Sequence, residues 1–369
     1  MITPFFPSNN SFVGNYIFDQ VNEIRKQTEF DIRIVKPVAL FSSEKDYEFK
    51  GFKVSIFRTI DFPFFIFPGV FNKINQNRFL SFLDKKGIEN IKYSHSHVSY
   101  PASYITDALH CKKMVQHHGL DVLQLLNGRN NFIKKIQRKF LIENTLKQLN
   151  KADLNIGVSR LVLDKLKEYH KYSPKGEYVL YNGVDTSKFY FKIMKKNEVF
   201  TIGCVANFWE IKDQVTLIKA VEKLEKKGTR ILLRLIGSGP TLESCKNYVL
   251  KNNLNDSIVF EEEIKHEKLN DWYNEIDLFV LPSYYEALGC VYLESWATNT
   301  PFISVENQGI SEIIPKAYKE KSEIVKSDFL NLSQKIAYFK KNKTNFEFDS
   351  QYDIKNTMSH FLKQDLFND

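Results

Sequence analysis

The chain has 369 residues, of which 43% are hydrophobic and 26% charged, so it is long enough for two domains and too apolar for a disordered protein. Its four cysteines lie far apart, with no C-x-x-C pair or Cys/His cluster, which excludes a disulfide framework and a zinc finger. No apolar run reaches the ~20 residues that span a bilayer and no signal-peptide pattern is visible, so we expect a cytoplasmic protein.

The net charge of +8 is divided unevenly along the chain. Residues 1–200 hold 31 Lys and Arg against 19 Asp and Glu, which gives +12, whereas residues 201–369 hold 21 against 25, which gives −4. A basic half favours nucleic acid, an anionic membrane surface or an acidic substrate as its partner. No zinc finger, helix-turn-helix pattern or RNA-binding aromatic pair accompanies the charge, so we do not expect nucleic acid.

Strand and helix patterns alternate through the first half. A short strand at residues 1–7 runs into a loop with Gly14, and a helix follows at 16–26 with apolar residues at helical spacing. The repetition predicts a parallel α/β sheet. Further strands are predicted at 31–35, 52–57, 91–95, 114–116 and 153–158, and further helices at 72–84, 102–109 and from 160.

A basic amphipathic helix is predicted at residues 132–149. Two interpretations stay open: an ordinary surface helix with a solvated charged face, or a helix that docks on anionic lipid headgroups. The aromatic cluster of Phe62, Phe64, Phe65 and Phe67 could add an apolar anchor or could equally belong to the core. The basic side chains are Lys134, Lys135, Arg138 and Lys139.

The second half restarts the alternation after a strand that ends in a turn, where we expect a positive φ at Gly183, and after a polar linker at 192–197. Gly237-Ser238-Gly239 lacks the third glycine of a dinucleotide fingerprint, which argues against an oxidoreductase. Predicted strands lie at 201–206, 230–236 and 258–260, and predicted helices at 213–226, 240–250, 265–273, 330–340 and 353–367.

The stretch from Leu278 to Pro315 carries the chemistry. The apolar run 278–281 predicts a strand buried on both faces, and Glu286 falls in the loop at its carboxyl end. Gly289 allows a tight turn into a helix that begins near Cys290 and carries Glu294. Backbone amides of Ala287, Leu288 and Gly289 would face an anion, and the two carboxylates would accept hydrogen bonds from sugar hydroxyls. An anion that bears hydroxyls suggests a nucleotide sugar.

These residues carry a family resemblance. Glu286 and Glu294 form an E-x7-E pair that resembles the one in retaining GT-B-fold glycosyltransferases of the family-4 type (glycosyl transferases group 1). The likeness extends through most of the chain: His118-Gly119-Leu120-Asp121 resembles the HG-x-D element of the family, and Asn182-Gly183-Val184-Asp185 resembles its N-G-V-D element. Of the two adjacent histidines, His118 is the one in register with Gly119 and Asp121.

The resemblance implies two doubly wound, Rossmann-like α/β domains that face each other across a cleft. Residues 1–185 would bind the acceptor, 186–350 the nucleotide-sugar donor, and a helix at 351–369 would return to the first domain. Gly14 would approach the donor diphosphate, and His118 would lie beside the reacting sugar. The sequence departs from the family in three places: the first strand is short, Asn207 stands where an Arg is usual before Lys212, and glutamates occupy 261–263, where a Gly usually lies near the base.

The implied reaction moves a sugar from a UDP- or GDP-linked donor to a hydroxyl of a saccharide or lipid-linked saccharide, with retention, in cell-surface polysaccharide or glycolipid biosynthesis. His118, Glu286 and Lys212 would be catalytic, and front-side attack needs no enzymic nucleophile. The chain contains no D-x-D, so we expect neither a metal nor a cofactor. The protein would lie in the cytoplasm or peripherally on the inner face of the plasma membrane. A nucleotide-sugar 2-epimerase and a non-catalytic nucleotide-sugar-binding module remain as alternatives.

Overall fold

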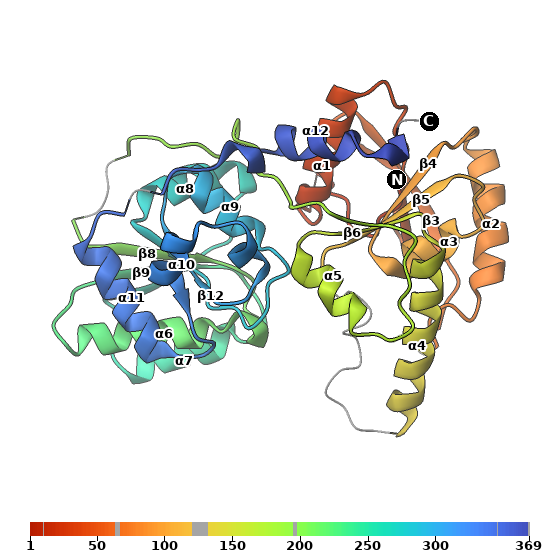
Figure 1. Ribbon diagram of the computed structural model, residues 1–369. Helices are drawn as coiled ribbons and strands as arrows, with labels where there is room; N and C mark the ends of the chain where they lie inside the picture. Colours follow the sequence, from red (N-terminus) through yellow and green to blue (C-terminus); the bar gives the residue numbers. More distant parts are fainter. Residues whose placement is uncertain (10, 63–66, 120–131, 195–197, 345, 368–369) are drawn as a thin grey trace. The chain divides into compact units, whose positions relative to one another are not determined.

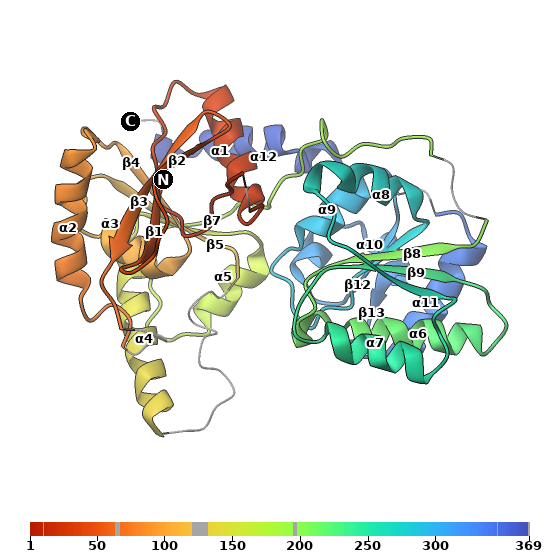
Figure 2. The same ribbon diagram turned by 180° about the vertical axis from the view of Figure 1, so that it is seen from behind.

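The computed structural model describes residues 1–369 apart from 10, 63–66, 120–131, 195–197, 345 and 368–369. The chain forms two compact units. Unit 1 consists of Met1–Asn182 together with Thr357–Asp369, and unit 2 consists of Gly183–Asn356. Each is a parallel sheet with helices on its faces (Figures 1 and 2). Unit 1 is therefore built from both ends of the chain.

The sheet of unit 1 has two parts that meet at Ile2. The first part has the order β1-β3-β2, with β2 antiparallel at its edge, and the second runs β4-β5-β6-β7 with all strands parallel. Ile2 bridges Val35 of β1 and Ser96 of β4. The strands are β1 (Ile34–Ala39), β2 (Tyr47–Phe49), β3 (Phe52–Thr59), β4 (Tyr93–His97), β5 (Lys112–His117), β6 (Leu154–Gly157) and β7 (Glu177–Val179).

The helices of unit 1 pack through apolar stripes at helical spacing. Ile17 and Val21 of α1 are fully buried against β3, and Phe79 and Leu83 of α2 are buried beside Ile2. The helices are α1 (Asn15–Gln27), α2 (Asn72–Lys85), a short turn η2 (Ser99–Ser103) continued by α3 (Tyr104–Thr106), α4 (Phe132–Lys151), α5 (Arg160–Lys167), α12 (Ile354–Leu362) and the turn η8 (Asp365–Phe367).

Unit 2 is built on a six-stranded parallel sheet with the order β10-β9-β8-β11-β12-β13. Helices α6 and α7 lie on one face of it, and α8 and α9 on the other (Figure 1). The strands are β8 (Thr201–Val205), β9 (Leu232–Ile236), β10 (Ile258–Glu261), β11 (Leu278–Val280), β12 (Phe302–Val305) and β13 (Glu323–Ile324). The helices are α6 (Gln214–Glu225), α7 (Leu242–Lys251), α8 (Leu269–Glu275), α9 (Cys290–Ala297), α10 (Lys316–Ser322) and α11 (Phe329–Lys341), with short turns η4 (Glu210–Lys212), η5 (His266–Lys268), η6 (Gly309–Glu312) and η7 (Ser350–Tyr352).

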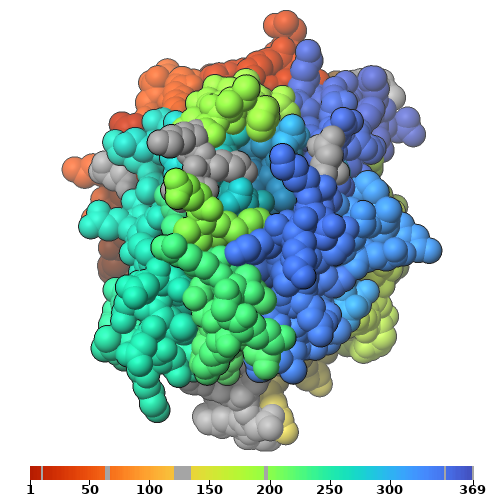
Figure 3. Space-filling model, turned by 90° about the vertical axis from the view of Figure 1, so that its left-hand side faces the viewer, coloured from red at the N-terminus to blue at the C-terminus, as the bar shows by residue number. Residues whose placement is uncertain are grey.

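The centre of this sheet explains the continuous apolar run in the sequence. Leu278, Phe279 and Val280 of β11 are all completely buried, because β11 lies between β8 and β12 and is covered on both faces. In the space-filling view the blue surface of α11 adjoins the green surface of α6 (Figure 3). No helix in the described part of the chain is long and apolar enough to span a membrane.

Several local predictions are wrong. Gly183 does not adopt a positive φ, because the backbone there is paired instead: Val184 N donates to Tyr352 O and Ile354 N to Val184 O, both over 3.0 Å. The predicted helix at 102–109 is reduced to η2 and α3. β1 begins at Ile34 and β4 ends at His97, two to three residues later than the apolar pattern indicates.

Candidate functional site

Two side chains 74 positions apart meet at the carboxyl edge of the sheet in unit 2. β8 and β11 are neighbours, so the loops that follow them leave the sheet together, at the edge where ligands of open α/β sheets bind. Lys212 lies in the loop after β8 and Glu286 in the loop after β11. Lys212 Nζ donates to Glu286 Oε1 over 2.5 Å, and the two side chains are 25% and 12% exposed. The structure thus pairs two of the three predicted catalytic residues.

The η4 turn, which carries Lys212, is also held by the buried carboxylate of the next residue, Asp213. Asp213 ends the η4 turn with φ 49°, and its Oδ2 accepts from Thr216 Oγ1 over 2.8 Å and from Ser327 Oγ over 3.0 Å. Burial raises the pKa of Asp213 above its ordinary value. The backbone before α6 is therefore held by side chains from α6 and from the loop before α11.

The loop of Glu286 leads into α9 with three backbone amides unused. Gly289 is the residue before the helix and has φ 81°. The N–H groups of Ala287, Leu288 and Gly289 donate no hydrogen bond to any residue that the structure describes. Ala287 and Leu288 are buried as residues, so these amides lie in a sheltered place. Unpaired amides at a helix start favour an anion.

Glu294 lies on α9 and is almost buried, with 8% of its surface exposed. Its Oε2 accepts from Tyr273 Oη over 3.0 Å, and its Oε1 lies 3.6 Å from His266 Nε2. Burial and the Glu294 charge raise the pKa of Tyr273 well above its usual value, so its hydroxyl stays a donor. These contacts fix the carboxylate from the side of α8.

Asn207 and the glycine loop after β9 occupy the next stretch of the same edge. Asn207 is exposed, and its carbonyl accepts from Gln214 Nε2 over 3.1 Å. The loop packs on this backbone so closely that a Cβ on Gly237 would lie 2.1 Å from Ala206 O. Beside it, Ser238 Oγ donates to Glu263 Oε1. Glu263, the last residue of the glutamate run, is therefore next to the glycine loop.

His118 directly follows β5 in unit 1 and contacts the aromatic rings of His97 and Tyr16. Its Nε2 lies 2.9 Å from His97 Nδ1, and the two rings stack at 5.2 Å. Burial lowers the pKa of His118 to about 3 and that of His97 well below its usual value, so both rings are neutral. His118 Nδ1 is buried and finds no partner within the described ranges.

Gly14 lies close to this histidine. It precedes α1 with φ 90°, and a Cβ there would come within 2.5 Å of Phe5 O. Tyr16, on the first turn of the same helix, places its ring 4.7 Å from that of His118. Asp121, the last residue of the predicted HG-x-D element, lies outside the described residues. His117 is a core residue whose Nε2 lies 3.3 Å from Asn155 Oδ1.

Sequence reasoning missed four residues of these two clusters: His97, Tyr16, Tyr273 and Gln308. His97 was missed because the predicted strand stopped at residue 95, two positions short. Gln308, in the connection after the neighbouring strand β12, bonds the loop of Glu286, and a contact between two connections leaves no local sequence pattern. No group of three or more His, Cys, Asp and Glu side chains suited to a metal ion occurs among the residues described.

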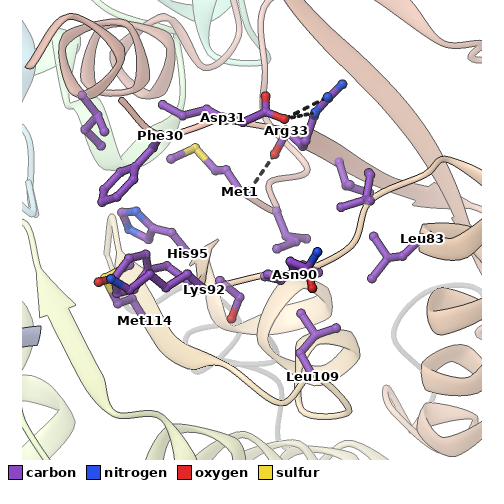
Figure 4. Close-up of a pocket in the computed structure, with 18 of the residues that line it drawn as sticks. Met1, Phe30, Asp31, Arg33, Leu83, Asn90, Lys92, His95, Leu109 and Met114 are labelled. Carbon is purple, nitrogen blue, oxygen red and sulfur yellow. Dashed lines mark hydrogen bonds and ion pairs between the residues drawn. The ribbon is translucent and has the colours of Figure 1, made fainter. Parts of the chain in front are cut away.

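One cavity of unit 1 lies beside the starts of β1 and β4. It measures about 320 Å³ and is lined by the connection 87–92, by side chains of β1, β4, α2 and the carboxyl-terminal segment, and by Leu109 and Met114 (Figure 4). Met1 donates its amino group to Arg33 O over 2.7 Å at its wall. His95 reaches it and stacks on His97 at 4.4 Å. The cavity is thus separated from His118 by the ring of His97.

Two family models match the chain in succession. Residues 13–188 match Glycosyltransferase Family 4, and residues 185–356 match Glycosyl transferases group 1. Among curated relatives, the O-antigen chain mannosyltransferase RfbU of Salmonella typhimurium is 26% identical over 174 residues, which is 47% of this chain and 47% of RfbU. The chain therefore matches about half the length of that relative.

Solved structures share the fold over nearly the whole chain. The sucrose-phosphate synthase of Thermosynechococcus elongatus aligns with a TM-score of 0.72 at 17% identity, over 94% of this chain and 88% of that one. Anabaena Alr3699/HepE, in complex with UDP and glucose, aligns with a TM-score of 0.69 at 12% identity, over 98% of both chains. With both halves matched by family models and the two Rossmann-like units of the GT-B fold in place, the chain belongs to the group 1, family-4-type glycosyltransferases.

Proposed function

We propose that the protein transfers a sugar from a nucleotide-sugar donor to a hydroxyl of a saccharide or lipid-linked saccharide, with retention at the anomeric carbon. The observation that carries the proposal is the Lys212–Glu286 pair next to the unused amides of Ala287, Leu288 and Gly289. A cation and several N–H donors are the groups that a diphosphate needs, and a carboxylate accepts from sugar hydroxyls.

In this mechanism the leaving group is the nucleoside diphosphate. Lys212 and the amides before α9 stabilise the negative charge that develops on it, and because they are already fixed they need no rearrangement in the transition state. Glu286, released from Lys212 by the incoming diphosphate, holds the transferred sugar. Glu294 accepts from the ribose hydroxyls, and neutral His118 donates or accepts a hydrogen bond at the sugar. The acceptor hydroxyl attacks from the face that the diphosphate leaves.

The proposal leaves two classes of nucleotide-sugar donor open, which differ in the base and in the sugar. Anabaena Alr3699/HepE is a complex with UDP and glucose and RfbU is a mannosyltransferase, which supports a test of both UDP- and GDP-linked hexoses. We propose that no metal or cofactor takes part, since Lys212 and the amides supply the charge stabilisation that a metal ion otherwise gives.

The test is a panel of UDP- and GDP-linked sugars, each with and without saccharide and lipid-linked acceptors, in the presence of EDTA or of added Mg²⁺. We expect one donor to yield nucleoside diphosphate and a glycosylated acceptor whose anomeric configuration matches the donor. Epimerised nucleotide sugar without acceptor would identify the 2-epimerase, and binding without turnover would identify the non-catalytic module.

We also propose that unit 1 docks peripherally on the anionic, cytoplasmic face of a membrane, through α4. Lys135, Ile136, Arg138 and Lys139 are exposed on its first turns, and Ile136 is 44% exposed. These turns extend beyond the sheet of unit 1 (Figure 1). The ring of Phe67 lies against that of Phe140, with 5.5 Å between the ring centroids, so Phe67 packs on α4. Phe62, in contrast, is 44% exposed. Phe64 and Phe65 lie outside the described residues.

A further inference from the structure

Gln308 lies at the carboxyl end of β12 and spans the loop that carries Glu286. Its side-chain Oε1 accepts from Glu286 N over 2.5 Å, and its Nε2 donates to Tyr284 O over 3.3 Å. The residue is 7% exposed. One carboxamide therefore satisfies a backbone donor and a backbone acceptor on either side of Tyr285.

The surrounding contacts join this clamp to the rest of the site. Gly309 N donates to Glu286 O over 3.1 Å, and Tyr284 N donates to Ile211 O over 2.7 Å, next to Lys212. The approach is so close that a Cβ on Gly309 would lie 1.8 Å from Ala287 O. Gln308, its neighbour Gly309 and the turn of Lys212 thus hold the Glu286 loop from two sides.

We infer that Gln308 is a positioning residue of the donor site, a role that rests on the proposed function. Its carboxamide fixes the backbone of Tyr284 and Glu286, and so directs the Glu286 carboxylate to Lys212 and the next three amides to the ligand. It also occupies the Glu286 N–H, so the ligand meets the amides of Ala287, Leu288 and Gly289 and not a fourth.

A carboxamide meets both requirements at neutral pH, because it carries a donor and an acceptor side by side. Leu has nearly the same size but offers neither a donor nor an acceptor, which leaves two backbone groups unpaired. A carboxylate accepts from Glu286 N but repels Tyr284 O. A protonated carboxyl group again offers one donor and one acceptor. The function of Gln308 is therefore open to test by chemistry as well as by size.

The experiment compares wild type with Gln308→Leu, Gln308→Glu and the matched control Gln334→Leu, which alters an exposed glutamine of α11. Transfer kinetics, melting temperature and amide hydrogen exchange of residues 284–289 are measured for each. Because misplacing a reacting group by about 1 Å costs up to roughly a hundredfold, we expect kcat to fall about tenfold to a hundredfold in Gln308→Leu, with faster exchange at 284–289. Gln334→Leu should match wild type.

Gln308→Glu supplies the readout that a merely structural role would not give. The introduced carboxyl group is buried, so its pKa is raised and it takes up a proton at mildly acidic pH. We expect kcat of this variant, relative to wild type, to rise several-fold as the pH falls from about 8 to about 5.5, while melting temperatures stay well above the assay temperature.

Wild-type kcat in Gln308→Leu, or a loss that follows the melting temperature and shows no pH rescue in Gln308→Glu, would overturn the inference and leave the proposed function intact. The wild-type arm tests the proposed function separately. A wild-type protein that transfers no sugar from any donor in the panel would overturn both.

Discussion

The loop of Glu286 and the surroundings of His118 are held in opposite ways. In unit 2 the loop is tied by backbone and carboxamide hydrogen bonds from two neighbouring connections, and the Glu286 carboxylate already has a cation as partner. In unit 1 His118 is held by ring contacts with Tyr16 and His97 and by one hydrogen bond between its Nε2 and His97 Nδ1, and buried polar atoms, including His118 Nδ1 and His97 Nε2, have no partner within the described residues.

The difference indicates which kind of ligand each region is suited to bind. A hydrogen-bonded loop with a preformed ion pair favours a strongly charged ligand, since the ligand has to compete with Glu286 for Lys212. A neutral, partly sheltered imidazole with one nitrogen that has no partner among the described residues favours an uncharged hydroxyl, because an unpaired buried polar atom gains a hydrogen bond when the ligand binds. The following experiments test this contrast, beginning with the largest expected effect.

The first breaks the ion pair. In Glu286→Ala and Lys212→Gln we expect turnover to fall about a hundredfold to a thousandfold, the usual loss when a group that stabilises developing charge is removed. The double variant should be little worse than the poorer single one, because the residues act as a unit. Steady-state kinetics measures the turnover of each variant, with Lys227→Gln, at an exposed lysine, as the control. Fully additive losses of turnover in the double variant would contradict the prediction.

The second removes the imidazole. His118→Ala should lower turnover by roughly a hundredfold, since the sugar loses a positioning contact, while nucleoside-diphosphate affinity stays near that of wild type. His117→Ala serves as the control and should act only through stability, as its ring lies in the core against Asn155. Wild-type turnover in His118→Ala would assign His118 a structural role.

The third tests the helix-borne carboxylate of unit 2. Glu294→Ala should weaken nucleoside-diphosphate binding by about 1.5 to 3 kcal/mol through lost charge-assisted hydrogen bonds. Tyr273→Phe removes the hydroxyl that contacts Glu294 but keeps the carboxylate, so its affinity should change far less. Titration calorimetry decides the point; equal losses in both variants would mean that the Tyr273 contact and not the ribose explains the effect.

The fourth experiment uses pH to test the burial of three histidines in unit 1. His95, His97 and His118 have lowered pKa values because of burial, so they stay neutral when folded but take up protons near pH 6.5 when unfolded. Their burial in the neutral form contributes fully to the free energy of unfolding above pH 6.5, and this contribution is lost as the pH falls toward about 3. Each should reduce the free energy of unfolding by about 1 kcal/mol between pH 7.5 and pH 5.5. Urea unfolding measures it, and His95→Asn should show a smaller pH dependence.

The fifth concerns the basic surface of unit 1 alone. Flotation with phosphatidylglycerol vesicles should recover more protein than flotation with phosphatidylcholine vesicles, and salt should abolish the difference. Lys135→Glu, Arg138→Glu and Lys139→Glu together should weaken binding by about 1 kcal/mol for each charge. The same charge change placed in unit 2 by Lys227→Glu, Lys246→Glu and Lys251→Glu should have little effect. Equal recovery with both lipids would mean that α4 presents only a solvated face.

Much of the fold could be predicted from the local sequence pattern, because parallel strands that are buried on both faces appear in the sequence as apolar runs. β11 and the start of α9 illustrate this, and Gly289, where a tight turn was predicted, has φ 81°. Gly183 does not, since a pairing with residues 352–354 replaces the local turn. The Lys212–Glu286 pair was predicted to belong to one site, but its direct contact, like the clamp by Gln308, depends on strand order, which periodicity does not encode.

The discontinuity of unit 1 has a consequence for the newly made chain. Phe361 and Phe367, near the carboxyl end, cover His95, Tyr93 and Tyr178 of the sheet that the first half forms. On a ribosome that adds about 5 to 20 residues per second, the whole of unit 2 is synthesised before that cover arrives, an interval of roughly ten to thirty seconds. During this time the rings of Tyr93, His95 and Tyr178 lack the cover of Phe361 and Phe367, so we expect the first half to bind chaperones of nascent chains more strongly than the finished protein does.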